Sequence, residues 1–187
     1  MLSQIPNAIT VLRALLVAPF VLALLNGRTG LALVVFLVAG ASDGLDGYLA
    51  KHYGWQSRVG AILDPLADKV LLVSAYLTLA WVGLLPAWLA AVVVARDVII
   101  VLGALIYHAA IAPYDLRPSA SSKLNTLAQL LLVVLVVLDS GWWALPTPLL
   151  SMMVYVVLVT TVWSGVGYVV TWGRRAWQAR RDGGARP

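Results

Sequence analysis

The sequence contains no cysteine and no glutamate, and only 11% of its 187 residues are charged. Without cysteine, neither disulfide bonds nor thiolate chemistry are available to the protein. Soluble domains carry about 25% charged residues, and a chain that is 61% hydrophobic cannot cover its surface with polar groups in water. These shortages exclude an ordinary soluble protein and predict one whose solvent is lipid.

The charge that is present is basic overall, with a net charge of +5. Much of it comes from a tail that begins at about residue 173. A basic tail beside a membrane usually lies against anionic lipid on the cytoplasmic side, so we expect membrane lipids as partners. We do not expect nucleic acid as a partner, because no soluble basic domain is evident to bind it. The tail arginines are Arg174, Arg175, Arg180, Arg181 and Arg186.

Six apolar runs are each close to the length of about 20 residues that crosses a bilayer. The short segment before the first run lacks the positive region of a signal peptide, so we expect this run to remain as a helix. The connections are short and no internal repeat is visible. The sequence therefore predicts an all-α polytopic membrane protein, with six transmembrane helices in one bundle and a single domain over residues 1–187. The expected spans cover residues 7–25, 31–50, 61–84, 87–111, 122–138 and 149–172.

The lysines and arginines predict the orientation of these spans. With the N-terminus inside, the inner connections contain Lys51, Arg58, Arg117 and Lys123, whereas the outer connections contain only Arg28. This asymmetry predicts a multi-pass protein of the cell membrane (a bacterial inner membrane) with cytoplasmic N- and C-termini.

All eight acidic residues are aspartates, and four of them lie in one stretch at the junction of the second and third spans. One aspartate at the centre of a membrane helix costs roughly 2.5–3.5 kcal/mol, and like charges one turn apart repel each other. A single such residue is often a helix–helix hydrogen bond. Four of them together indicate carboxylates that are either largely protonated or bound to a cation. They are Asp43, Asp46, Asp64 and Asp68.

Helical spacing gathers these aspartates on two faces, at the end of the second span and the start of the third. Because a short connection joins the two spans, we expect the faces to converge near the cytoplasmic surface. Small residues on both faces leave room for a bulky phosphate ligand. The first face consists of Asp43, Asp46, Gly47 and Ala50, and the second of Gly60, Asp64 and Asp68.

Oxygen ligands without histidine or cysteine favour hard cations such as Mg²⁺, Mn²⁺ or Ca²⁺. Four carboxylates are enough for two metal ions, and two ions about 4 Å apart suit phosphoryl transfer because they stabilise the attacking and leaving oxygens. A divalent-cation transporter is a second function class that explains intramembrane carboxylates. Transporter sites, however, usually lie near the midplane between repeated halves.

From Asp43 the chain reads D-x-x-D-G-x-x-A-K, then eight residues, then G-x-x-x-D-x-x-x-D. This resembles the signature of the CDP-alcohol phosphotransferase (CDP-alcohol phosphatidyltransferase) family, D-x-x-D-G-x-x-A-R-x₈-G-x-x-x-D-x-x-x-D. Lys51 departs from the family's arginine, keeping the charge without the bidentate geometry. The resemblance implies a six-helix membrane enzyme, commonly a homodimer, with a cytoplasmic active site.

The resemblance also implies roles for individual residues. Two divalent ions, Mg²⁺ or Mn²⁺, are held by the aspartates, and Asp68 is in addition the catalytic base that takes the proton of the acceptor hydroxyl. CDP-diacylglycerol is the expected donor, with Lys51 facing its diphosphate. Asn7 and Thr10 belong to a P-N-x-x-T-x-x-R pattern placed near the nucleotide, although Asn7 alternatively caps the helix. The metal ligands are Asp43, Asp46, Asp64 and Asp68, and the donor pocket consists of Gly47, Ala50, Lys51, Gly60, Asn7 and Thr10.

Two further cations are candidates for binding the acceptor, which is a lipid or a small phosphorylated alcohol. Arg96 lies mid-span, where an arginine is a functional candidate; the alternative is a structural ion pair. Lys123 opens the fifth span; the alternative is a lysine that extends to the membrane surface. The segments GAILDPLADKVLL, ARDV and SKLNTLAQ are most similar to cardiolipin synthases, which transfer the phosphatidyl group to phosphatidylglycerol and release CMP. Phosphatidylglycerophosphate synthases, which use glycerol 3-phosphate, are the alternative.

Overall fold

The computed structural model describes residues 5–53, 60–110 and 120–183, with side chains described within 10–42, 66–103 and 120–174 except Trp172. Over these residues the chain forms six α-helices and no strand, which confirms the predicted all-α class. The helices are α1 (Ile5–Leu25), α2 (Thr29–Tyr53), α3 (Gly60–Trp81), α4 (Ala87–Ala110), α5 (Ala120–Gly141) and α6 (Thr147–Gly183).

Every helix end but one lies within three residues of the predicted span, and the exception is the end of the last helix. Helix α3 ends at Trp81, before the predicted end at residue 84. Helix α6 continues beyond residue 172 to Gly183, because the basic segment is rich in alanine, arginine and glutamine, which are good helix formers. The polar continuation of α6 is therefore an extension of the last span and not a separate element.

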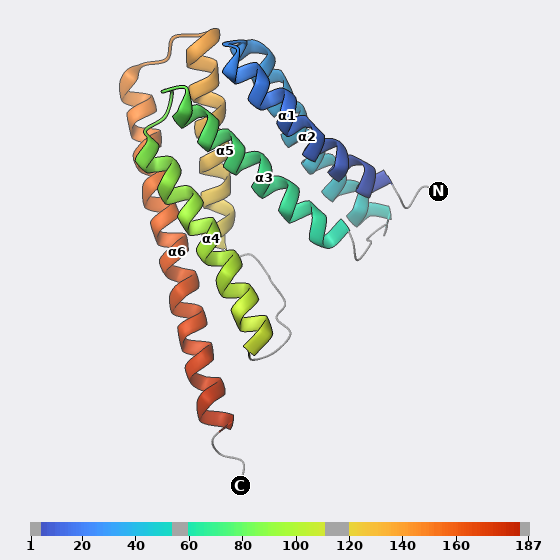
Figure 1. Ribbon diagram of the computed structural model, residues 1–187, viewed down its shortest axis with the longest axis vertical. Coiled ribbons are helices and arrows are strands. Elements are labelled where there is room, and N and C mark those ends of the chain that lie inside the picture. Colours follow the sequence, from blue (N-terminus) through green and yellow to red (C-terminus); the bar gives the residue numbers. More distant parts are fainter. Residues whose placement is uncertain (1–4, 54–59, 111–119, 184–187) are drawn as a thin grey trace.

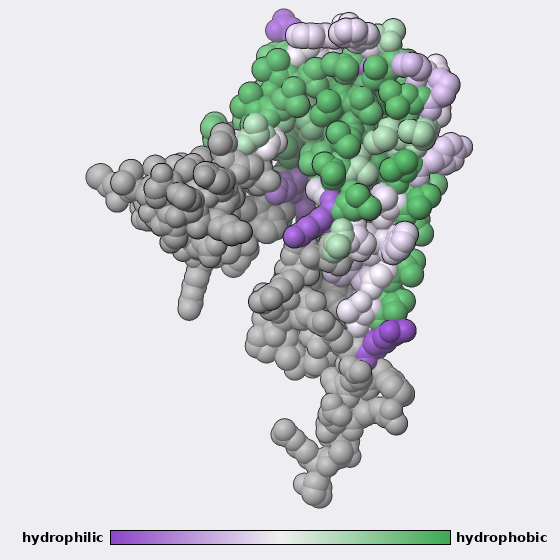
Figure 2. All heavy atoms as spheres, turned by 180° about the vertical axis from the view of Figure 1, so that it is seen from behind, coloured by the Kyte–Doolittle hydropathy of each residue, from purple (hydrophilic) through white to green (hydrophobic). Residues whose placement is uncertain are grey.

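Two helical segments in the described part of the chain are long and apolar enough to cross a membrane, Ala120–Gly141 and Thr147–Thr171. Two further segments, Thr10–Leu25 and Thr29–Ser42, are apolar but shorter. Six transmembrane helices therefore stay a prediction. The described surface is nevertheless strongly apolar, as Figure 2 shows for one face, and large exposed apolar surfaces are typical of contact with a membrane or a partner.

Glycine ends two of the helices in the same way. Gly27 follows α1 with φ +67°, and Gly83 follows α3 with φ +78°. In each case the next residue donates its backbone N–H to a carbonyl five positions earlier, Arg28 to Ala23 at 2.8 Å and Leu84 to Leu79 at 2.9 Å. This is the Schellman arrangement, in which glycine accepts the left-handed conformation without a steric penalty. It produces the tight reversals into α2 and α4.

The three short connections, α1 to α2, α3 to α4 and α5 to α6, lie at one end of the molecule, the upper end in Figure 1. The end of α2 and the start of α3 lie toward the opposite end, as does the C-terminal end of α6. Helix α1 packs against both α2 and α3, while α6 packs against α4 and α5. Contacts of α2 with α5 and of α3 with α4 join the two groups.

The apolar core fills the half of the molecule that carries the short connections. Phe20 of α1 and Phe36 of α2 contact each other with ring centroids 5.3 Å apart. Tyr76 of α3, Leu89 of α4 and Leu132 of α5 are fully buried in the same cluster. This core holds together the half of the molecule that carries the short connections, and the buried arginines Arg13 and Arg96 lie outside it.

Candidate functional site

The two halves of the aspartate motif lie on helices, as the sequence predicts. Asp43 to Lys51 form part of the last turns of α2, and Gly60 to Asp68 form the first turns of α3. Both segments lie toward the end of the molecule away from the short connections (Figure 1). The side chains of the predicted site residues Asn7, Asp43, Asp46, Gly47, Ala50, Lys51, Gly60 and Asp64 lie outside the described residues.

Asp68 is the motif aspartate whose side chain the structure describes. Its Oδ1 accepts a hydrogen bond from Nη1 of Arg13, and the two groups form an ion pair. The side chain of Arg13 is fully buried, whereas 39% of the Asp68 side chain is exposed. The pair connects α1 to α3 and leaves the Asp68 side chain partly exposed.

Arg13 is a residue whose role the sequence reasoning missed. It is the last residue of the P-N-x-x-T-x-x-R pattern, and it lies one turn after Thr10, which is also buried. An arginine in an otherwise apolar helix requires a partner in the protein interior, and this requirement is the signal that could have revealed it. Which aspartate forms the partner depends on how α1 crosses α3.

Arg96 of α4 is buried and is held by three helices. Its Nη1 donates to Asp97 Oδ1 at 2.6 Å, and its Nη2 donates to Ser122 Oγ of α5 at 2.8 Å and to Ser164 Oγ of α6 at 2.5 Å. The guanidinium also lies 5.9 Å from the ring centroid of Tyr168, within the range of a cation–π interaction. Arg96 thus occupies a rigid site where α4, α5 and α6 meet.

Asp97 also contacts a second cation. Its Oδ1 lies 2.9 Å from Nζ of Lys69 on α3, and the Lys69 side chain is 32% exposed. The predicted alternative of a structural ion pair for Arg96 is therefore present. Two cations share one anion, however, so Lys69, Asp97 and Arg96 together carry one excess positive charge, which an anionic group would neutralise.

Lys123, the other acceptor-binding candidate, is exposed. It follows Ser122 directly on α5, and successive helical residues point in different directions. Among the described residues, the Arg96 guanidinium contacts Asp97, Ser122, Ser164 and Tyr168. The structure therefore places Lys123 on the same helical turn as Ser122 without bringing its side chain into this cluster.

Two polar side chains of α5 face the interior. Asn125 and Gln129 are buried. Asn125 Oδ1 accepts hydrogen bonds from Oγ1 of Thr160 at 3.0 Å and of Thr161 at 2.8 Å, both on α6. The phenol of Tyr76 on α3 donates to the backbone oxygen of Gln129 at 3.3 Å. Interhelical hydrogen bonds of this kind join helices in an apolar environment.

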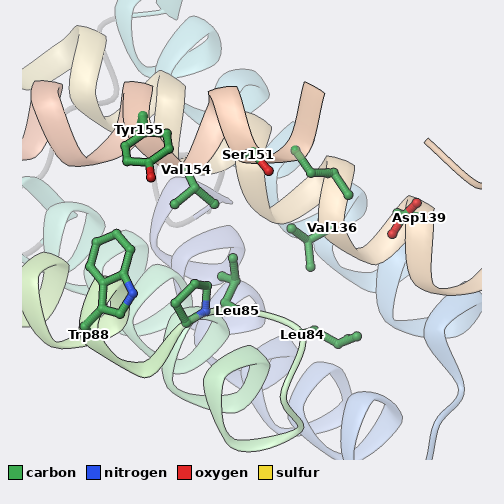
Figure 3. A pocket seen from close by; sticks show the side chains of 10 residues that line it. Leu84, Leu85, Trp88, Val136, Asp139, Ser151, Val154 and Tyr155 are labelled. Atoms are coloured by element: carbon green, nitrogen blue, oxygen red, sulfur yellow. The ribbon is translucent and has the colours of Figure 1, made fainter. Parts of the chain in front are cut away.

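Two hollows are present in the described surface, and neither contains the aspartate motif. One, of about 290 Å³, lies between the start of α4 and the facing parts of α5 and α6. Figure 3 shows its apolar side chains, with Trp88 opposite Tyr155 and Asp139 at one end. The other, of about 380 Å³, is an apolar groove between α4 and α6 whose lining includes Arg96 and Gly165. The described side chains hold no group of three or more potential metal ligands.

Comparisons with known proteins agree with the motif. A family model described as CDP-alcohol phosphatidyltransferase matches residues 3–163. A probable cardiolipin synthase (CMP-forming) of Drosophila melanogaster is 33% identical over 183 residues, which cover 89% of this chain and 56% of the fly protein. A probable phosphatidylglycerophosphate synthase of Mycobacterium tuberculosis is 32% identical over 176 residues, which cover 90% of this chain and 81% of that protein. The chain thus spans little more than half the length of the fly relative.

Proposed function

We propose that this chain, which belongs to the CDP-alcohol phosphatidyltransferase family, synthesises phospholipid by transferring a phosphatidyl group from CDP-diacylglycerol to an alcohol. The family and enzyme class predicted from the signature are confirmed. The observation that carries the proposal is the family match over residues 3–163, because it contains both halves of the aspartate motif and Arg13.

Phosphatidylglycerol is the acceptor that we propose, with cardiolipin and CMP as products. The sequence likeness to cardiolipin synthases and the 33% identity to the fly protein of that name support it. Glycerol 3-phosphate is the second candidate, supported by the 32% identity to a protein named probable phosphatidylglycerophosphate synthase, which the chain covers more completely.

The proposed reaction exchanges one phosphorus–oxygen bond for another. The acceptor hydroxyl oxygen bonds to the lipid-side phosphorus of CDP-diacylglycerol, and the bond from that phosphorus to the bridging diphosphate oxygen breaks, which releases CMP. Asp68 takes the hydroxyl proton, a role that suits a carboxylate with 39% of its side chain exposed. Lys51 lies against the diphosphate, and Asn7, Thr10, Gly47, Ala50 and Gly60 line the nucleotide pocket.

Two divalent metal ions belong to the proposed site, with Asp43, Asp46, Asp64 and Asp68 as ligands. The donor set fits Mg²⁺ or Mn²⁺ because it consists entirely of carboxylate oxygens. The partial exposure of the Asp68 side chain fits as well. Bound ions of this kind neutralise a diphosphate and stabilise the attacking and leaving oxygens.

Arg96 is the proposed anchor for the phosphate of the acceptor, with Lys123 at the entrance. The excess positive charge of the Lys69, Asp97 and Arg96 cluster supports this role. We further propose a homodimer in the cell membrane with the aspartate end cytoplasmic. Arg28 lies in a short connection at the other end of the molecule, in agreement with the predicted distribution of basic residues.

The experiment that tests the function is CMP release by the purified chain in detergent, with CDP-diacylglycerol and Mg²⁺ or Mn²⁺. Phosphatidylglycerol and glycerol 3-phosphate are supplied in separate reactions, and a chelator is added to a third. Release with phosphatidylglycerol alone supports cardiolipin synthesis, and release with glycerol 3-phosphate alone supports the second candidate. Loss of CMP release in the reaction with chelator supports the dependence of the reaction on a divalent metal ion. The transporter alternative is tested with the protein reconstituted in lipid vesicles. Divalent-metal flux into these vesicles, together with no CMP release from CDP-diacylglycerol, would favour it.

A further inference from the structure

Building on the proposed function, we infer that Arg13 of α1 is the positioning residue of the catalytic carboxylate. Arg13 donates from Nη1 to Oδ1 of Asp68, and its side chain is fully buried. It touches neither reacting atom in this scheme. It holds Oδ1 of Asp68 from the α1 side, so that the carboxylate keeps a constant direction toward the acceptor hydroxyl.

The unequal burial of the two partners supports this role. The guanidinium is fully buried, while Asp68 remains 39% exposed. A pair that served only to neutralise two interior charges would bury both partners. Here the cation is hidden and the anion is accessible, which suits a carboxylate that must receive a proton and still keep its orientation.

Fastening α1 to α3 does not explain the pair. Both helices contribute to the apolar core, through Phe20 and Leu24 of α1 and Leu72, Ala75 and Leu79 of α3. Replacing a buried ion pair by apolar residues is often neutral or stabilising, so such a pair is weak evidence for a stabilising role. The retention of a charge pair beside this core therefore points to chemistry.

Because the residue at position 13 is arginine and not lysine, the two possible roles of its positive charge predict different effects of a lysine substitution. A guanidinium is a planar fork that holds a carboxylate in a defined direction, whereas a lysine ammonium is a point charge on a flexible stem. If Arg13 only neutralised Asp68, lysine would replace it fully. If it orients Asp68, lysine restores the charge but only part of the rate.

The test compares Arg13→Gln, Arg13→Lys and the control Arg28→Gln, in which an exposed arginine at the opposite end of the molecule is neutralised. CMP release is measured with both substrates varied, and CDP binding is measured by calorimetry with Mn²⁺. For Arg13→Gln we expect kcat to fall by about 10²-fold, the loss typical of a misplaced catalytic group. Both KM values and the CDP affinity should stay within about twofold. Arg13→Lys should recover part of kcat, and Arg28→Gln should match the wild type.

A double variant separates positioning from other roles. If Arg13 acts through Asp68, adding Arg13→Gln to Asp68→Asn should lower the residual CMP release no further. An unchanged kcat in Arg13→Gln, or a raised KM with unchanged kcat, would overturn the inference while wild-type CMP release leaves the proposed function standing. If Arg13→Gln does not fold, full wild-type kcat in Arg13→Lys is the overturning result. Absence of CMP release in the wild type would instead reject the function.

Discussion

Asp68 and Lys69 are adjacent on α3, but their side chains pair with helices on different sides of it. Asp68 pairs with Arg13 of α1, and Lys69 lies 2.9 Å from Asp97 of α4. One step along the chain therefore joins the proposed catalytic carboxylate to the charged cluster around Arg96.

Asp68→Asn should lower CMP release by about 10²–10⁴-fold, the usual contribution of a general base. The amide keeps the shape of the carboxylate but cannot take the hydroxyl proton. Some metal-dependent CDP binding should remain, measured by calorimetry with Mn²⁺. Wild-type turnover in this variant would reject the assignment of Asp68 as the base.

The matched control for Asp68→Asn is Asp139→Asn, which makes the same chemical change near the short connections. Asp139 Oδ1 accepts a hydrogen bond from the backbone N–H of Leu145 at 2.7 Å. Asparagine retains an oxygen acceptor for this N–H, so we expect CMP release close to that of the wild type.

Arg96→Lys should raise the KM of the acceptor by about 10-fold or more, since hydrogen bonds to charged groups contribute about 1.5–3 kcal/mol. Lysine keeps the charge but cannot reproduce the guanidinium contacts with Asp97, Ser122 and Ser164. The KM of CDP-diacylglycerol should change little. Arg174→Lys, at an exposed position of α6, is the control; equal acceptor KM values in the two variants would argue against an acceptor site at Arg96.

Thr161→Val should lower the free energy of unfolding by about 0.6 kcal/mol and by no more than about 1.7 kcal/mol, the mean and the maximum measured for interhelical hydrogen bonds in a membrane protein. The substitution removes the hydroxyl that donates to Asn125 Oδ1 at 2.8 Å between α6 and α5. Unfolding in mixed detergent measures the change. Thr171→Val is the control, because the Thr171 hydroxyl donates to the Gly167 carbonyl of its own helix at an exposed position; a loss of the same size there would contradict the expectation.

Gly141→Ala should destabilise the protein by about 1–3 kcal/mol, as overpacking of a tight contact does. A Cβ at Gly141 would lie 2.0 Å from Oγ1 and 2.9 Å from Cβ of Thr29, at the start of α2. Gly40→Ala should instead stabilise the protein. A Cβ there meets nothing within 4 Å, and alanine in a helix is favoured by about 1 kcal/mol. A melting temperature that rises for Gly141→Ala as it does for Gly40→Ala would show that the contact with Thr29 is not close.

The sequence was enough to predict the helices and the family, because both depend on local patterns. Apolar runs of membrane length have the same meaning wherever they pack, and the end of α1 follows from Gly27 alone. The motif from Asp43 to Asp68 is likewise a matter of spacing along two consecutive helices, so it was recognisable without knowledge of the bundle.

What the sequence could not decide is which buried charges meet. Arg13 and Asp68 are 55 positions apart, and Arg96 is 68 positions from Ser164. Such contacts depend on the angle and register at which α1 crosses α3 and α6 crosses α4, which are set by many side chains packing together. The sequence by itself determined that carboxylates gather between Asp43 and Asp68, at the junction of α2 and α3. The tertiary structure alone decided that Arg13 holds Asp68 and that Lys69 and Arg96 share Asp97, because an ion pair requires contact within a few ångströms.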